Sequence, residues 1–157
     1  MNVTRRSALA LSAGAVAALS LGVPFVGVPG ATVAVAKGNA VDDAIAKFAG
    51  GATPGTGKVS LTTPEIAENG NTVPISFSVE SPMTDESYVT SVLVLADGNP
   101  NPGVATFNFS KMSGEASAAT RVRLAKTQNI IAVAKMSDGT VFMDKKEIKV
   151  TIGGCGG

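Results

Sequence analysis

The only cysteine of this 157-residue chain lies in the terminal pentapeptide Gly153-Gly154-Cys155-Gly156-Gly157. A catalytic cysteine needs a neighbouring base or cation that ionises its thiol, and a structural cysteine needs apolar neighbours. Glycine supplies none of these, because it has no side chain. The thiol is therefore expected to be free, bonded to another molecule, or covalently loaded, with its activation supplied by another protein.

The residues before the pentapeptide predict how that thiol is held. Ile148, Val150 and Ile152 alternate with polar residues, as in a strand with one buried face. Such a strand fixes the chain up to about Ile152, and glycine then has unusually wide backbone freedom. Three extended residues span roughly 10 Å. Residues 153–157 are thus predicted to be a flexible arm in which Gly153, Gly154, Gly156 and Gly157 let Cys155 enter a narrow pocket.

Other interpretations of the tail are weaker. One alternative is a frayed end without function, but five consecutive residues of only Gly and Cys are improbable by chance. A lipoprotein cysteine would follow the leader, and a prenylated cysteine would lie one residue further from the end. Ubiquitin-like sulfur carriers also end in Gly-Gly and load sulfur on the terminal carboxylate, here that of Gly157. Their activation is cytosolic, which an export signal disfavours.

Residues 1–36 are typical of such an export signal. Arg5-Arg6 precede a long apolar run that ends in Ala34-Val35-Ala36, a small-x-small cleavage pattern. The run is long enough to span a bilayer, but its glycines, Pro24 and Pro29 make it a poor helix. We expect a cleaved twin-arginine-type signal peptide, export to the periplasm, and no membrane attachment after cleavage.

Composition excludes several function classes. Without the leader, 11 Lys and Arg face 12 Asp and Glu, so the surface is not basic and nucleic acid is not an expected partner. The chain contains no histidine, which removes the usual general base and the commonest ligand of zinc and copper. We therefore expect no enzyme activity, no metal and no cofactor.

Residues 37–56 are predicted to form a short helix and a linker. Asn39 is a good N-cap, and Gly50-Gly51 end the helix. Val41, Ile45 and Phe48 share one stripe, which should dock on the domain or on a partner.

Residues 57–152 are predicted to be a β-sandwich domain, because their pattern changes to period two with many β-branched residues. Val122 and Leu124 share one face of a strand with Arg121 and Arg123 on the other, and Ser137-Asp138-Gly139 indicates a tight hairpin. Further runs with strand character lie at 59–61, 73–79, 89–95, 107–109, 130–134, 140–143 and 148–152. Seven or eight short strands favour an all-β, antiparallel two-sheet sandwich, with a small barrel as the alternative.

The leader, the small β-rich domain and the terminal GGCGG together resemble the SoxY family of thiosulfate-oxidation carrier subunits. Internal segments that look like those of the family occur in the same order: residues 67–74 (AENGNTVP), 81–83 (SPM) and 97–107 (DGNPNPGVATF). The resemblance covers essentially the whole mature chain.

The resemblance implies an immunoglobulin-like sandwich that pairs with a homologous β-sandwich subunit, SoxZ. It implies that a c-type cytochrome partner joins Cys155 oxidatively to thiosulfate, giving a cysteine S-thiosulfonate. A metal-dependent hydrolase then releases sulfate, and a sulfur dehydrogenase oxidises the remaining sulfane sulfur. On this hypothesis the protein carries the intermediate and catalyses no step itself.

Two other hypotheses belong to different classes. A structural or adhesive β-sandwich would use Cys155 only for an intermolecular disulfide, with the reducible dimer as its working form. An enzyme would use Cys155 as a nucleophile and show turnover as the purified chain alone.

Overall fold

The strands are built from alternating apolar and polar residues. In β3 (Val73–Val79), the odd-numbered side chains are buried and the even-numbered side chains face outward. The computed structural model describes residues 39–154. The predicted signal peptide and the residues Cys155, Gly156 and Gly157 lie outside the described residues.

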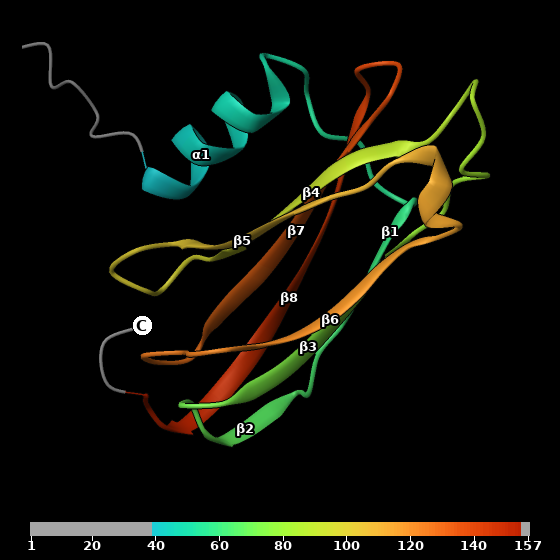
Figure 1. Ribbon diagram of the computed structural model, residues 1–157. Helices are drawn as coiled ribbons and strands as arrows, with labels where there is room; N and C mark the ends of the chain where they lie inside the picture. The colour runs from blue at the N-terminus through green and yellow to red at the C-terminus, as the bar shows by residue number, and fades with distance from the viewer. Residues whose placement is uncertain (1–38, 155–157) are drawn as a thin grey trace, which may run out of the picture. The chain divides into compact units, whose positions relative to one another are not determined.

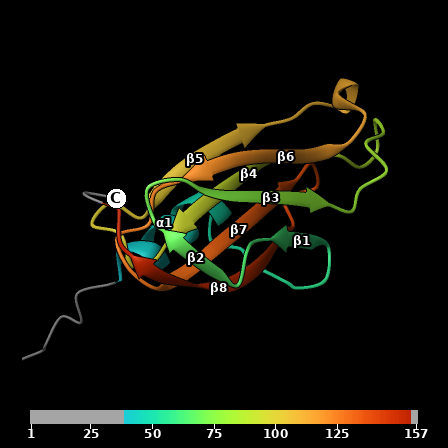
Figure 2. The same ribbon diagram turned by 90° about the horizontal axis from the view of Figure 1, so that it is seen from below.

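Two sheets form the domain (Figures 1 and 2). One sheet has the strand order β1-β3-β6, and the other has the order β2-β8-β7-β4-β5. The remaining elements are β1 (Val59–Thr62), β2 (Ile66–Asn69), β4 (Val89–Ala96), β5 (Gly103–Asn108), β6 (Ala116–Val122), β7 (Gln128–Met136), β8 (Val141–Ile152), α1 (Ala40–Ala49) and a 3₁₀ turn, Lys111–Ser113. The predicted all-β sandwich with a short N-terminal helix is confirmed.

One strand pair departs from the predicted antiparallel arrangement. β2 pairs parallel to β8, with Ala67 opposite Val150 and Asn69 opposite Ile152. The chain leaves the first sheet after β1, passes Pro64, and enters the second sheet at the edge of β8 without reversing direction. The residues of β2 were not predicted as a strand, because its pattern buries only Ala67.

Helix α1 begins and ends as its sequence predicts. The Asn39 side chain accepts a hydrogen bond from the Val41 N–H, and Gly50 ends the helix in a left-handed conformation with φ 64°. Val41 is buried, and Ile45 and Phe48 are half-buried against Leu95 and Val133 of the second sheet. The apolar stripe therefore docks on the domain itself (Figure 1).

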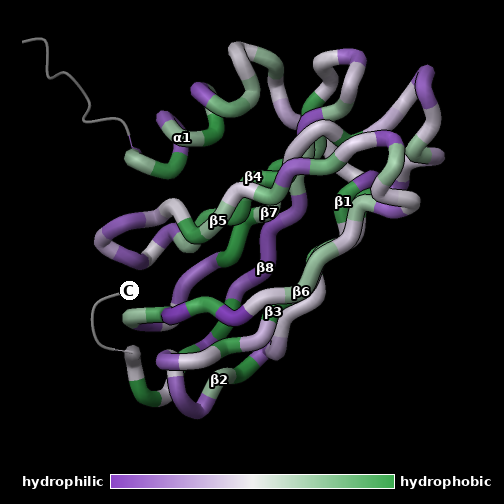
Figure 3. Tube along the Cα trace, in the orientation of Figure 1, coloured by the Kyte–Doolittle hydropathy of each residue, from purple (hydrophilic) through white to green (hydrophobic). Residues whose placement is uncertain are grey.

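This docking explains why β4 and β7 are apolar on both faces. Val92, Val94 and Ala132 face the core between the sheets, whereas Leu95 and Val133 face α1. Figure 3 shows the resulting hydrophobic positions along both strands. The chain's own helix thus buries the second apolar face of these strands.

Aromatic rings pack against one another in the hydrophobic core between the two sheets. Phe77 of β3 contacts Phe107 of β5 and Phe109 edge to face, with ring centroids 5.2 and 6.3 Å apart.

The Asp144 carboxylate on β8 accepts a hydrogen bond of 2.9 Å from the Leu61 N–H, and so ties the edge strand β1 to the other sheet. No helix in the described part of the chain has the length and apolar character to cross a membrane.

The β7–β8 hairpin turns at residues 137–140, as predicted. Gly139 has a φ of 85°, and Asp138 accepts hydrogen bonds from the hydroxyl and the N–H of Thr140, at 2.6 and 2.8 Å. The bond from the Thr140 hydroxyl, with that from its N–H, holds the pKa of Asp138 below its ordinary value.

We expect the substitution Asp138→Asn to remove one pH-dependent part of the stability. Because the folded-state pKa is lowered, the carboxylate stabilises the fold above its unfolded-state pKa of about 3.9, and this contribution is lost as the pH falls through the folded-state value. Between about pH 6 and pH 2, urea denaturation should therefore show a larger loss of unfolding free energy for the parent protein than for the variant. Equal losses would contradict this account.

Candidate functional site

Three backbone segments meet where the last strand ends. The Gly70 N–H, in the turn between β2 and β3, donates to the Ile152 carbonyl at 2.7 Å. The Gly70 carbonyl accepts from the Leu124 N–H at 2.8 Å, and the Leu124 carbonyl accepts from the Gly154 N–H at 2.8 Å. We call this cluster, Gly70 with residues 123–125 and 152–154, the arm root. It holds the chain immediately before Cys155.

Glycine is required at the arm root because the backbones approach too closely for a side chain. A Cβ atom added to Gly153 would overlap the Ala125 carbonyl oxygen, and one added to Gly70 would overlap the Leu124 carbonyl oxygen. A Cβ on Gly154 would lie 2.8 Å from Cγ of Arg123 and 2.9 Å from the Gly70 carbonyl oxygen. Real Cβ contacts are longer than this, so all three glycines permit close packing.

The sequence predicted a flexible arm over residues 153–157, of which the structure describes Gly153 and Gly154. Gly154 is buried, and its N–H is hydrogen-bonded to Leu124. The chain is therefore held up to Gly154, two residues beyond the predicted anchor at Ile152. The sequence could not show this, because the contacting residues lie about 30 and 80 positions away. Cys155, Gly156 and Gly157 lie outside the described residues.

The Asn99 side chain holds the central segment of the arm root. Its amide nitrogen donates to the Arg123 carbonyl at 2.8 Å. Its carbonyl oxygen accepts from the Ala125 N–H at 3.1 Å and from Gln128 Nε2 at 2.8 Å. One side chain in the β4–β5 loop therefore fixes the backbone on both sides of Leu124.

A buried glutamine completes this connection. Gln128 is 4% exposed, and its Oε1 accepts from the Gly98 N–H at 2.7 Å. A Cβ on Gly98 would lie 2.7 Å from Cβ of Gln128, so the loop fits against Gln128 only with glycine there. The sequence marked this loop only as part of a segment, residues 97–107, that looks like one of the SoxY family. The structure gives it a further role, since it supports the segment that holds Gly154.

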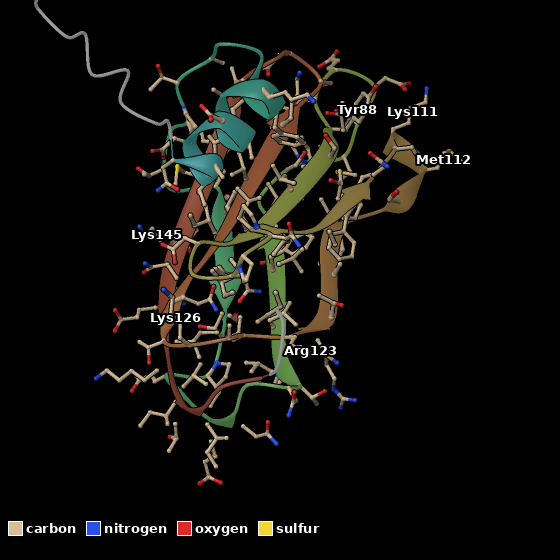
Figure 4. The ribbon with its side chains drawn as sticks, turned by 90° about the vertical axis from the view of Figure 1, so that its left-hand side faces the viewer. Tyr88, Lys111, Met112, Arg123, Lys126 and Lys145 are labelled. Carbon is tan, nitrogen blue, oxygen red and sulfur yellow. The ribbon has the colours of Figure 1, made fainter. Side chains whose placement is uncertain are left out.

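Positive charge lies beside the arm root. The Arg123 side chain passes along Gly154, and the exposed Arg121 lies two residues earlier, on β6. Figure 4 shows Arg123 and Lys126 at the opposite end of the sandwich from Tyr88, Lys111 and Met112. The described residues contain no cluster of three or more metal-ligating side chains. The sequence put both arginines on one face, but it gave no sign that this face adjoins the terminus.

The match to one protein-family model covers the arm root and shows to which family the chain belongs. A model of the family described as "Sulfur oxidation protein SoxY" matches residues 45–155, from α1 to the cysteine. The chain belongs to the SoxY family. Comparison with curated proteins finds no match for the chain.

A solved SoxY structure supports the same assignment. The chain is 30% identical to "the sulfur carrier protein SoxY" from Chlorobium limicola f thiosulfatophilum, with a TM-score of 0.60. The alignment covers 70% of this chain and 90% of that chain. The predicted resemblance to SoxY is therefore confirmed.

The fold is shared more widely than the SoxY family. A superoxide reductase (neelaredoxin) from Ignicoccus hospitalis aligns with 19% identity and a TM-score of 0.54, over 60% of this chain and 80% of that chain. The superoxide reductase from Nanoarchaeum equitans aligns with 14% identity and a TM-score of 0.51, over 60% and 99%. At these identities the likeness shows the fold alone.

The close packing at the arm root predicts that Gly153→Ala destabilises the protein. The new methyl group forces the backbones at residues 125 and 153 apart, which should cost about 1–3 kcal/mol. Gly103→Ala is the matched control, because an added Cβ at Gly103 meets no atom within 4 Å. Thermal unfolding should show a lower midpoint for the Gly153 variant and little change for the control. Equal midpoints would mean that the contact is not tight in solution.

A second prediction concerns the support from Asn99. Asn99→Ala removes three hydrogen bonds and leaves polar groups unpaired, so it should cost about 1–3 kcal/mol. Hydrogen exchange at the Leu124 and Gly154 amides should accelerate as the arm root loosens. Asn101→Ala is the control, since Asn101 is exposed and makes no side-chain hydrogen bond within the described residues. Unchanged hydrogen exchange at both amides in the Asn99 variant would show that the Asn99 side chain does not support the arm root.

Proposed function

We propose that this protein is a periplasmic sulfur-substrate carrier that holds thiosulfate-derived intermediates covalently on Cys155 and presents them to partner enzymes. The observation that carries the proposal is the position of the only cysteine. It follows directly after the anchored Gly154, at the end of the segment that matches the SoxY family. The related Chlorobium protein is described as a sulfur carrier.

The loading chemistry forms one sulfur–sulfur bond. The Cys155 thiolate and thiosulfate (S₂O₃²⁻) combine to Cys155–S–S–SO₃⁻ and release two electrons, which a c-type cytochrome coupling enzyme accepts. Water then cleaves the terminal sulfonate as sulfate in a metal-dependent hydrolase, with release of two protons, and leaves a persulfide on Cys155. A sulfur dehydrogenase oxidises the sulfane sulfur of that persulfide. Each step requires redox or metal chemistry, which the partners supply.

The fold suits a carrier that visits several active sites. The arm root holds the chain up to Gly154, the residue directly before Cys155, by backbone hydrogen bonds. A tethered intermediate also meets each active site at a raised effective concentration and does not diffuse away. Export through the twin-arginine pathway and pairing with a SoxZ-type β-sandwich subunit are parts of the same proposal.

Covalent loading should depend entirely on Cys155. Incubation with thiosulfate and the coupling cytochrome should increase the intact mass of the parent protein by one thiosulfate-derived group. The variant Cys155→Ser should show no increase, because no other thiol exists in the chain. Intact-mass spectrometry with peptide mapping measures both results.

A relocated thiol provides the matched control. In the double variant Cys155→Ser with Met112→Cys, the thiol lies on an 86% exposed position at the opposite end of the sandwich. This variant should remain unloaded by the cytochrome although its thiol is accessible. Full loading of the Cys155→Ser variant would refute the carrier function. If the parent protein gave only a reducible dimer, the result would support a structural disulfide instead.

A further inference from the structure

Strand β6 forms one margin of its sheet, because its only partner strand is β3. The Leu124 N–H donates to the Gly70 carbonyl in the turn before β3, so the even-numbered backbone groups of this segment lie on the β3 side. Backbone groups alternate between the two sides of a strand, and those of Ser117, Ala119 and Arg121 therefore point away from β3. Within residues 39–154, no other segment bonds to these groups. The outer edge of β6 thus offers a row of N–H and C=O groups to a further strand.

The other edge strands of the two sheets are protected. β1 and β2 have four residues each, and the Leu61 N–H on the outer side of β1 bonds to Asp144. β5 follows Pro100 and Pro102, and a bulge interrupts its pairing with β4. β6 has seven residues, with neither a proline nor a charged residue before Arg121. Because short length, proline, bulges and charges are the usual protections of a sheet edge, the bare edge of β6 indicates a strand that pairs with another chain.

The two ends of β6 carry opposite charges. Glu115 lies directly before the strand, and the Ser117 hydroxyl donates to its carboxylate. Arg121 and Arg123 lie at the other end, and all three charged side chains are exposed. None of the three belongs to an ion pair within the described residues. A second copy of β6 that runs antiparallel reverses this order, so each end meets the opposite charge.

Pairing around a two-fold axis at Ala119 uses the whole strand. Ala119 then lies opposite its own copy, and Ser117 lies opposite Arg121 of the second copy. These are the residues whose backbone groups point outward, so each such pair can exchange both N–H···O bonds. Continued by one residue, the register places Glu115 opposite Arg123 of the second copy and diagonal to its Arg121. Small alanine and serine side chains specify a register weakly, and the charges therefore select this one.

Apolar side chains lie along the margin of the sandwich that β6 borders. In Figure 2, β6 runs along this margin with β3 on its inner side. Ala118 of β6 and the rings of Phe107 and Phe109 are half-buried against the core, and Phe77 of β3 contacts both rings. A further strand lies about 4.8 Å from β6 in the hydrogen-bonding direction. Such a strand covers part of this apolar margin, which favours association.

We propose that β6 pairs antiparallel with β6 of a second copy of this chain, so that two three-stranded sheets join into one continuous sheet. The interface goes beyond the proposed carrier function and does not depend on it. Arg123 lies beside the arm root, at one end of β6. Because the paired strands run in opposite directions, the arm roots of the two copies lie at opposite ends of the joined sheet.

A charge exchange tests the interface. Sedimentation equilibrium with reductant, which excludes a disulfide dimer, should show a concentration-dependent dimer. Glu115→Arg brings like charges together and should raise the dissociation constant about tenfold. Glu115→Arg/Arg123→Glu should restore most of the affinity. Residues 115 and 123 are roughly 27 Å apart in one extended strand, so this rescue can arise only between copies. Glu68→Arg, the same change on β2, is the control and should leave the dissociation constant unchanged.

A disulfide trap tests the register. In the Cys155→Ser background, Ala119→Cys puts the only thiol at the two-fold axis, where paired Cα atoms lie about 5.5 Å apart, a distance that a disulfide spans. Oxidised glutathione should convert this variant into a covalent dimer. Ser78→Cys in the same background is the control, because Ser78 is exposed on the inner strand β3 and should give no dimer.

Three results would each overturn the interface. They are a protein that stays monomeric at every concentration, a dimer whose dissociation constant Glu115→Arg leaves unchanged, and equal cross-linking at positions 78 and 119. Both cross-linking variants lack Cys155, so their outcome does not depend on the carrier function.

Discussion

The contact of three backbones at Gly70, Leu124 and Gly154 is the constraint on which the functional end of the molecule depends. Three hydrogen bonds of 2.7–2.8 Å join these segments, and glycine at 70, 153 and 154 is what allows them to approach. A rigid exit point matters for a tethered cargo, because every extra free residue must be ordered when a partner binds, at a backbone cost of about 1–2 kcal/mol each. The hydrogen bonds among Gly70, Leu124 and Gly154 remove this cost for the chain up to Gly154.

The two faces of the sandwich have different roles. Helix α1 covers the outer face of the larger sheet, which stabilises β4 and β7 by burying apolar residues on both of their faces. The outer face of the β1-β3-β6 sheet lacks such a cover from the described residues and carries Arg121 and Arg123. The helix is therefore part of the scaffold, and the open sheet face adjoins the carrier end.

The sequence predicted local features well and long-range contacts poorly. Short patterns of neighbouring residues predicted the helix cap at Asn39, the helix end at Gly50, the hairpin at Asp138 and most of the strands. The parallel β2 strand was missed because four residues with one buried side chain carry no periodic signal. The role of Asn99 and the tight packing at Gly153 were missed because their partners are distant in sequence. Cys155 stays a prediction from composition, since it is the only thiol and lies between glycines.

The central claim is that Cys155 carries a sulfur intermediate while it leaves the domain from a fixed point. The most direct measurement is the mass of the C-terminal peptide that contains Cys155, isolated under non-reducing conditions from cells oxidising thiosulfate. The account predicts a population of this peptide with a covalently attached thiosulfonate or persulfide on the cysteine. A peptide found only as the unmodified thiol, or only in disulfide linkage to another protein chain, would contradict it.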